Sequence, residues 1–335
     1  MNPIISAVIP VRNRKEITQK ILKQIFFQVN QINQSDRILV IVVDDGSTDG
    51  TKEMINSEFP QVHLIEGDGT LWWAGAIVSG MNYALSNLQT DYVVWLNDDI
   101  SLSANFIENL VNICHNSVRM ETTIIGGIVT DETYPNWIVY GGFEGRKSVS
   151  DLKIFHDSEE LEVNVLCGNI VVISRHIINK IGFPNHIKLP QHGGDFEYIM
   201  RATKAEIKII LSSKLRASND YRLEDFIRYM PYLLQWYVQP SLVKRWEVIK
   251  GLTSYKANHS IWQVVGLHSK NRYLETIPKW KYILCYLNKL IRLLAINFVP
   301  EKKIQSKLEA FLEYQNPPQE IIDMLFKQSN QRSLK

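Results

Sequence analysis

The chain has 335 residues, of which 45% are hydrophobic and 21% are charged, the proportions of an ordinary globular protein. The formal net charge is only +2, but residues 1–223 carry 20 Lys and Arg against 26 Asp and Glu, whereas residues 224–299 carry 11 against 4. An acidic front half argues against a nucleic-acid-binding face. The basic segment is suited to an anionic membrane surface or a phosphorylated molecule.

The sequence shows no sign of export, of metal–sulfur chemistry or of a spanning helix. Its first residues contain neither a charged start nor a long apolar run, and its three cysteines are widely separated without CxxC spacing. No stretch reaches 18 uninterrupted apolar residues, and the best candidate, residues 280–299, carries three basic side chains. We therefore expect a cytoplasmic protein without a disulfide framework, a zinc site or a transmembrane helix.

The first hundred residues alternate short apolar runs with helical patterns, which predicts parallel strands joined by helices. The predicted strands are 5–10, 38–43, 62–65 and 91–96, and the predicted helices are 17–29, a segment ending near 58, and 75–88. The run 38–43 is almost entirely β-branched, as expected for a strand buried on both faces. This order predicts a nucleotide-binding α/β domain.

From residue 124 the predicted strands are shorter and are separated by polar or glycine-rich stretches. These strands are 124–129, 138–140, 162–166, 170–173 and 208–211, and the later predicted helices are 195–204, 225–237, 280–295 and 304–314. The polar residues from Gln328 onward predict a frayed tail.

Two carboxylates, Asp98 and Asp99, follow the apolar strand 91–96. An open α/β sheet binds ligands at the carboxyl ends of its strands, and carboxylates there are costly unless they are solvated, paired or holding a cation. Mg²⁺ typically takes one or two carboxylates and completes its shell with water and phosphate oxygens. The alternative is a solvated turn that caps a helix beginning near Ser101 or Ser103.

A second acidic turn, residues 44–49, ends the strand 38–43. It combines carboxylates, which accept hydrogen bonds from a ribose or a base, with the N–H groups of a helix start, which favour anions. The alternative is an Asx turn in which Ser47 or Asp49 caps the following helix.

Three segments in this order, 7–13, 43–49 and 96–99, resemble the family-2 inverting glycosyltransferases of the A-type fold. The resemblance covers roughly residues 4–220. The run Trp-Trp-Ala-Gly at 72–75 is further similar to bacterial rhamnosyltransferase-type members of that family.

This resemblance implies a nucleotide-diphospho-sugar transferase fold, an α/β arrangement with a mixed, mainly parallel sheet flanked by helices. It implies a catalytic domain at 1–223, with a nucleotide-binding part at about 1–100 and an acceptor part at about 101–223. Residues 224–335 are then a helical C-terminal extension.

By the same resemblance, Pro10, Val11 and Arg12 lie beside the nucleotide. Asp44 and Asp45 contact its base or ribose.

Residues 97–99 occupy the position of the family's Asp-x-Asp metal motif. Asp99 matches the second carboxylate and is the expected ligand of Mg²⁺ or Mn²⁺. Asn97 stands where the first Asp usually stands, and because an amide binds a cation without neutralising it, Asp98 is expected to compensate as a second ligand. Asn97 and Asp98 are also expected to contact the donor. The family's late His has no counterpart in residues 215–220.

The loop 67–75 and the helix after it resemble the family's segment under the donor sugar and diphosphate, where glycine permits close approach to phosphate. Donor contacts are therefore expected at Gly69, Trp73, Gly75 and Asn82. Trp72 is expected to stack on the acceptor, and packing against neighbouring helices is the alternative for one of the two tryptophans.

Residues 192–201 resemble the acceptor-side helix of the family. Asp195 matches the carboxylate that serves as general base, and Gly194 replaces the Glu that usually precedes it. From physical chemistry alone, Asp195 is a helix N-cap, and Glu197 is a first-turn dipole partner that also serves as the reserve base. Arg201 is expected to pair with one of these carboxylates. Gly168 and His192 are further candidates for acceptor contacts.

The implied activity is transfer of one sugar from a UDP- or dTDP-sugar to a hydroxyl of a glycan or lipid-linked acceptor, with inversion and with Asp195 as base, in cell-envelope polysaccharide synthesis. Processive relatives carry a Gln-x-x-Arg-Trp motif, and residues 242–246 lack its Gln. Two alternatives remain: a catalytically inactive sugar-nucleotide-binding or scaffold protein of the same fold, and a nucleotidyltransferase. The second is disfavoured because residues 10–15 contain no glycine.

Residues 277–299 interleave basic and aromatic side chains. A cap over the acceptor cleft, a homo-oligomer surface and a helix at the inner face of the membrane all remain open for this segment. The simplest interpretation is a helix packed on the main domain with a solvated basic edge.

Overall fold

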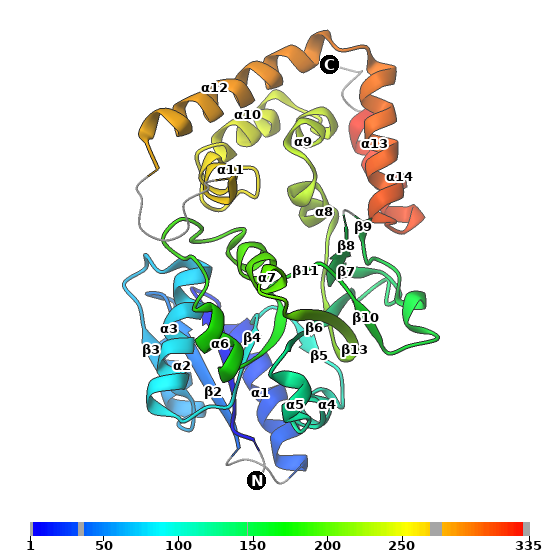
Figure 1. The fold of residues 1–335 in the computed structure, drawn as a ribbon. Helices are drawn as coiled ribbons and strands as arrows, with labels where there is room; N and C mark the ends of the chain where they lie inside the picture. The colour runs from blue at the N-terminus through cyan, green and yellow to red at the C-terminus, as the bar shows by residue number, and fades with distance from the viewer. Residues whose placement is uncertain (1–2, 33–36, 146, 269–276, 331–335) are drawn as a thin grey trace. The chain divides into compact units, whose positions relative to one another are not determined.

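The computed structural model describes residues 3–32, 37–145, 147–268 and 277–330 (Figure 1). The chain forms two compact units: unit 1 is Met1–His186 with Gly194–Asp220, and unit 2 is Ile187–Gly193 with Tyr221–Lys335. The sequence placed the boundary at 223 and did not predict that the segment Ile187–Gly193 belongs to the second unit.

A mixed sheet forms the centre of unit 1. Its strands are β1 (Ile5–Val11), β2 (Ile38–Asp44), β3 (His63–Glu66), β4 (Tyr92–Leu96), β5 (Ser101–Leu102), β6 (Thr123–Asp131), β7 (Ile138–Tyr140), β10 (Glu160–Glu162), β12 (Ile170–Ser174) and β13 (Lys208–Asn219). The order is β10-β13-β6-β12-β4-β1-β2-β3, with β5 paired to β13 and β7 paired to β6. Strands β3, β2, β1 and β4 run parallel, and β12 is antiparallel to β4 and β6. The sheet is therefore mixed and mainly parallel, as predicted.

Helices cover both faces of this sheet. The helices of unit 1 are α1 (Lys15–Gln31), α2 (Thr51–Glu58), α3 (Trp72–Asn87), α4 (Phe106–Cys114), α5 (Ser117–Met120), α6 (Arg175–Ile181) and α7 (Gly194–Lys204), with a 3₁₀ turn at Leu152–Phe155. Buried residues of α1, α2 and α4 belong to one apolar core, and those of α3, α6 and α7 belong to another. A small sheet of β8 (Gly142–Glu144), β9 (Lys147–Ser148) and β11 (Val165–Leu166) completes the unit.

Strand β4 shows how the sequence produces this layering. Its residues are all buried, and successive side chains of a strand point to opposite faces of the sheet. Tyr92, Val94 and Leu96 accordingly join the core beneath α1, whereas Val93 and Trp95 join the core beneath α3. A strand buried on both faces must be apolar throughout, and its first polar residues therefore mark its end.

Unit 2 is helical in the part that the structure describes. Its elements are α8 (Leu223–Tyr229), α9 (Tyr232–Val238), α10 (Leu242–Gly251), α11 (Ile261–His268), α12 (Lys279–Ala295), a 3₁₀ turn (Ile296–Phe298), α13 (Glu301–Gln315) and α14 (Gln319–Asn330). Over the described ranges, no single helix has the length and apolar composition of a membrane span. The segments Lys279–Phe298 and Glu301–Gln315 have them only as a pair, bent by 117°.

The predicted helix 225–237 is in fact two helices, because Pro231 lacks the N–H that would continue the first one. The side chain of Gln235 closes the break, since its Nε2 donates to the carbonyls of Arg228 and Met230, each at 2.8 Å. The sequence pattern showed helical spacing throughout and concealed the interruption.

Two strand predictions were also wrong in extent. The segment 162–166 is not one strand: it contains the last residue of β10 and both residues of β11, and these two strands belong to different sheets. The strand predicted at 208–211 continues to Asn219, past an irregularity between Ser212 and Arg216 in its pairing with β6. Polar residues at that irregularity interrupt the apolar pattern, although the backbone ladder continues.

Two predicted ends differ as well. Ser101 and Leu102 form strand β5 instead of a helix start, and the helix begins at Phe106. Helix α14 continues to Asn330, so the tail predicted from Gln328 is helical in its first residues. Residues 331–335 lie outside the described part.

Gly80 is required where α3 packs on the sheet. A β-carbon built on Gly80 would lie 2.3 Å from Val8 Cγ1 and 3.2 Å from Val43 Cγ2. Replacing glycine by alanine inside a helix normally stabilises it by about 1 kcal/mol. Here we expect Gly80→Ala to lower the free energy of unfolding by about 1–3 kcal/mol, because the core is overpacked. Denaturant unfolding checks this, with the exposed Ser86→Ala of the same helix as control. An equally stable Gly80→Ala protein would contradict the packing described.

Candidate active site

The turns that follow β1 and β2 are tied together by Asn13. Its backbone N donates to Ser47 Oγ at 2.7 Å, and its Oδ1 accepts from Thr48 N at 2.7 Å. The backbone N of Lys15 donates to Asp49 Oδ2 at 2.9 Å. Asn13 has a φ of 51°, a left-handed conformation that Asn tolerates better than most residues. These bonds fix the ends of two neighbouring parallel strands relative to each other.

Asp45 holds the loop that leads into α3. Its carboxylate is buried, and it accepts from Gly69 N at 2.8 Å and Leu71 N at 3.1 Å through Oδ1, and from Trp72 N at 3.0 Å through Oδ2. Arg12 Nη1 donates to the carbonyl of Gly69 at 2.5 Å. The carboxylate that the sequence assigned to a base or ribose is thus occupied by the protein's own backbone N–H groups. Asp45 positions the loop.

The other residues predicted beside the nucleotide differ in exposure. Asp44 is buried, and its Oδ1 accepts from Ser47 N at 2.9 Å in the Asx turn that was the alternative prediction. Val11 is buried in the core beneath α1, and Pro10 is partly buried. Arg12 is the most accessible of these side chains, with 48% of its surface exposed.

Asp98 and Asp99 share one guanidinium. Arg14 Nη1 lies 2.8 Å from Asp98 Oδ1 and 3.1 Å from Asp99 Oδ2. The side chain of Asp98 is only 3% exposed, whereas that of Asp99 is 36% exposed. Asn219 Nδ2 donates to the backbone carbonyl of Asp99 at 2.5 Å from the end of β13. The sequence identified the two carboxylates but neither Arg14 nor Asn219.

Burial governs the protonation of this group. Burial raises the pKa of Asp98 to about 6, against the lowering effect of Arg14. For Arg14 itself, burial acts to lower the pKa, but Asp98 and Asp99 together outweigh it and the net pKa is raised. The guanidinium therefore stays charged, and the carboxylate titrates within reach of neutral pH.

The two carboxylates suit a divalent cation as the protein's share of a ligand shell. Asp98 Oδ2 is buried without a hydrogen-bond partner among the described residues, and Asp99 is open to solvent. Both offer hard oxygen donors of the kind that Mg²⁺ and Mn²⁺ prefer. Over the described ranges, no group of three or more His, Cys, Asp or Glu side chains is arranged around a common point. A Mg²⁺ ion that is bound by one or two carboxylates typically completes its shell with water and phosphate oxygens.

A continuous set of contacts joins the acidic strand end to Asp195. Trp73 Nε1 donates to Asn97 Oδ1 at 2.9 Å, and the Trp73 ring meets Trp95 edge-on with centroids 5.7 Å apart. Gly168 lies against the same ring, because a β-carbon there would be 2.7 Å from Trp73 Cη2 and 3.0 Å from Asp195 Cβ. Gly168 N donates to Asp195 Oδ2 at 3.0 Å. Residues from four separate parts of the chain thus form one site.

Helix α7 distinguishes its two acidic side chains. Glu197 forms a bidentate ion pair with Arg201, with both N–O distances at 3.0 Å. Arg201 also donates to the carbonyls of Phe183, at 2.8 Å, and Ile181. The reserve base is therefore engaged in holding the helix to the preceding loop, whereas Asp195 lies in the first turn beside Gly168.

Some predicted residues lie elsewhere. Asn82 is exposed on α3, ten residues beyond Trp72 and so about 15 Å along the axis, and the structure does not bring it to the strand ends. Trp72 begins α3 with a φ of 57°, a strained conformation for a bulky residue, and Gly75 is buried in the next turn. His192 belongs to unit 2, where its Nε2 lies 3.1 Å from the carbonyl of Lys256.

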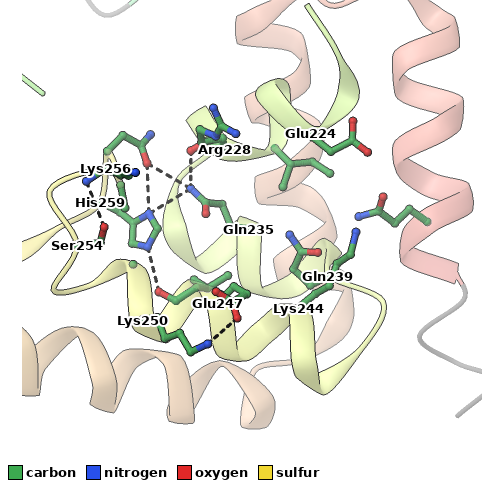
Figure 2. Close-up of a pocket in the computed structure, with 16 residues that line it drawn as sticks. Glu224, Arg228, Gln235, Gln239, Lys244, Glu247, Lys250, Ser254, Lys256 and His259 are labelled. Atoms are coloured by element: carbon green, nitrogen blue, oxygen red, sulfur yellow. Dashed lines mark hydrogen bonds and ion pairs between the residues drawn. The ribbon is translucent and has the colours of Figure 1, made fainter. Parts of the chain in front are cut away.

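Unit 2 contains a cavity of about 450 Å³ between α8, α9, α10 and the loop before α11 (Figure 2). Most of the residues that line it are polar, and they include Glu224, Arg228, Lys244, Lys250 and His259. None of the residues that the sequence assigned to the site lines it. The strand ends and Asp195, not this cavity, are the candidate active site.

Comparison with known proteins bears on the family and the fold. The model of the family described as glycosyl transferase family 2 matches residues 6–182, more than half of the chain. The protein belongs to this family. The mannosyltransferase PcManGT from Pyrobaculum calidifontis, solved with GDP-Man and Mn²⁺, has a TM-score of 0.52 at 14% identity and covers all of this chain and 87% of its own. GalNAc-T7, solved with UDP, GalNAc and Mn²⁺, has a TM-score of 0.51 at 15% identity and covers 74% and 48%. The fold is that of the A-type glycosyltransferases, as predicted.

The curated relatives match shorter stretches of the chain. Glycosyltransferase AglE of Haloferax volcanii is 26% identical over 207 residues, which are 61% of this chain and 62% of AglE. An uncharacterised glycosyltransferase of Rickettsia felis is 30% identical over 128 residues, 37% of this chain but only 19% of its own length. The chain thus spans about a fifth of the Rickettsia felis relative and less than two thirds of AglE.

The raised pKa of Asp98 makes stability depend on pH. The folded protein binds the proton of Asp98 more tightly than the unfolded chain, in which the carboxyl has its ordinary pKa of 3.8. The stabilisation of the fold by this proton is therefore fully present below pH 3.8 and is lost as pH rises through about 6. A difference of about two pH units corresponds to about 3 kcal/mol. We expect Asp98→Asn to remove this loss, as measured by denaturant unfolding between pH 4 and 7 in the presence of EDTA. Asp99→Asn is the control, because it keeps the buried carboxylate. Parallel pH curves for wild type and Asp98→Asn would contradict the assignment.

Proposed function

We propose that the protein transfers a single sugar from a nucleoside diphosphate sugar to a hydroxyl of a glycan or lipid-linked acceptor, with inversion at the anomeric carbon. One observation carries the proposal: Asn97, Trp73, Gly168 and Asp195 are in consecutive contact, which joins the acidic end of β4 to a carboxylate on α7. A donor diphosphate at the strand end and an acceptor hydroxyl near Asp195 would then share one site.

The donor side follows from charge. As the bond to the sugar breaks, negative charge develops on the leaving diphosphate, and fixed cationic groups stabilise it. Arg12, exposed beside the loop at Gly69, and Arg14, at the two carboxylates, supply positive charge from the chain itself. Asp99 and Asp98 would hold Mg²⁺ or Mn²⁺, which adds charge stabilisation without proton transfer.

The acceptor side follows from proton transfer. A sugar or lipid hydroxyl is too weak an acid to attack at neutral pH without a base within hydrogen-bond reach. Asp195 is the better candidate, because the carboxylate of Glu197 is committed to Arg201. The Gly168 N–H bond orients Asp195 through Oδ2. Attack from the face opposite the leaving group then inverts the sugar centre.

We infer that the donor is a UDP- or dTDP-sugar from the rhamnosyltransferase-like segment at 72–75. The neighbours in fold were solved with GDP-Man in one case and with UDP and GalNAc in the other, which supports a nucleotide sugar in general. Hydrolysis of UDP-, dTDP- and GDP-sugars by the purified protein would identify the class. Equal turnover of all three would argue against a UDP or dTDP preference.

We expect Asp195→Asn to lower the rate of transfer by about 10²–10⁴-fold while nucleotide binding is retained, because the amide keeps the bond from Gly168 but cannot accept a proton. Transfer assays and calorimetric titration of the nucleotide measure the two effects. Glu197→Gln is the matched control, and it should cost stability more than rate because it breaks the pair with Arg201. Near-normal turnover by Asp195→Asn would remove this residue from the role of base.

One observation favours a second candidate, a sugar-nucleotide-binding protein without transferase activity. Arg14 already forms an ion pair with both carboxylates, and Gly194 stands where the family usually has a Glu. Calorimetry with UDP and dTDP, with and without Mn²⁺, followed by the donor hydrolysis assay, separates the two functions. Tight nucleotide binding that is independent of Mn²⁺, with no hydrolysis of any donor, would favour the binding protein.

A further inference from the structure

The exposed apolar side chains of the molecule gather on one segment of unit 2. Of the nineteen large apolar side chains that are exposed in the described residues, seven lie in the twenty residues that include α12 and the turn after it. They are Trp280, Ile283, Leu284, Leu287, Ile291, Leu294 and Phe298. Single exposed apolar residues are ordinary, but a contiguous group of this size marks a contact surface.

These side chains share one side of the helix. At about 100° per residue, the six that belong to α12 fall within an arc of about 100°, the width of an apolar face that is normally buried. Phe298, which follows in the 3₁₀ turn, is 90% exposed. We call these seven residues the apolar face of α12.

The opposite side of α12 attaches the helix to unit 2. The Tyr282 ring lies 4.9 Å from the Trp262 ring between centroids, Lys289 Nζ lies 4.2 Å from the centroid of Tyr232, and Leu293 is fully buried. Because these contacts hold the helix in place, the apolar face is not needed for docking α12. Its exposure in the described residues makes it a candidate surface for a partner.

The charge of α12 indicates what that partner is. The helix contains Lys279, Lys281, Lys289 and Arg292 and no acidic residue. Lys279 and Lys281 are exposed on either side of Trp280, an aromatic residue of the kind that lies at the boundary between lipid headgroups and acyl chains. Basic side chains bordering an apolar face complement a surface that is apolar inside and anionic outside.

A second copy of the chain matches this surface less well. A twofold interface places the same patch against itself, so the cations of one α12 would approach those of the other. With no acidic residue on the helix to pair with them, this arrangement is repulsive. An anionic lipid surface carries the opposite charge.

We propose that α12 binds the surface of an anionic bilayer, with its apolar face inserted to the headgroup–acyl boundary and with Lys279 and Lys281 among the lipid phosphates. Helices of this kind lie in the plane of the interface and enter it by about 5–10 Å. The sequence favoured a packed helix with a solvated basic edge, and the exposed apolar face is what that interpretation did not include. The proposal is independent of the transferase activity.

Co-sedimentation of the full-length protein with vesicles of phosphatidylcholine, with and without phosphatidylglycerol, tests this. We expect binding only to the phosphatidylglycerol vesicles and weakening by salt. Ile283→Ser with Leu287→Ser should lower the vesicle partition coefficient by at least about tenfold, because two exposed side chains no longer enter the lipid. Lys279→Gln with Lys281→Gln should lower it by about fivefold for each charge.

The matched control removes two exposed apolar side chains from unit 1, with Phe27→Ser and Val118→Ser. It should bind vesicles as the wild type does, and circular dichroism should show all three double variants folded. Undiminished binding by Ile283→Ser with Leu287→Ser, or no binding of the wild type to either vesicle, would overturn the proposal. Sedimentation analysis adds one more outcome: a wild-type dimer that this variant dissociates, without vesicle binding, would assign the face to a second copy instead.

Discussion

A buried carboxylate at the end of β4 and the guanidinium beside it are the interaction on which the candidate site depends. Asp98 is withdrawn from water by the apolar strand before it, and Arg14 supplies the positive charge that makes this burial tolerable. Arg14 follows Asn13, which ties the turns after β1 and β2. Two consecutive residues therefore connect the ends of three adjacent strands. The rest of the site is built on this edge, since Asn97, adjacent to Asp98, leads through Trp73 and Gly168 to Asp195.

Much of this arrangement could be predicted because the decisive signals are local. A β-branched run followed by acidic residues marks both a strand and its end, and parallel strands place those ends at one edge. The acidic pair and the parallel strands of the first hundred residues followed from such runs, and the mixed sheet followed from the resemblance to the family. Asp195 followed from a likeness in a short segment, and the structure brings it to the same site as Asn97 through contacts that no local pattern contains.

The rest depends on contacts between residues that are far apart in the chain. Arg14 reaches a carboxylate 84 positions away, so nothing near either residue indicates the pair. Asp45 has the sequence context of a ligand-binding carboxylate, yet its oxygens are used by a loop more than twenty positions later. In unit 2 the opposite occurs, because a single local residue was missed: Pro231 divides a helix whose apolar spacing is uninterrupted.

Gly168 separates two parts of the candidate active site, Trp73 and Asp195. The Trp73 ring lies on one side of Gly168, and Asp195 at the start of α7 lies on the other. Only glycine fits between them, because a β-carbon on Gly168 would clash with both. The separation of Trp73 from Asp195 is therefore set by an absent methyl group. An alanine at this position would lengthen that separation without altering any polar group of the candidate site.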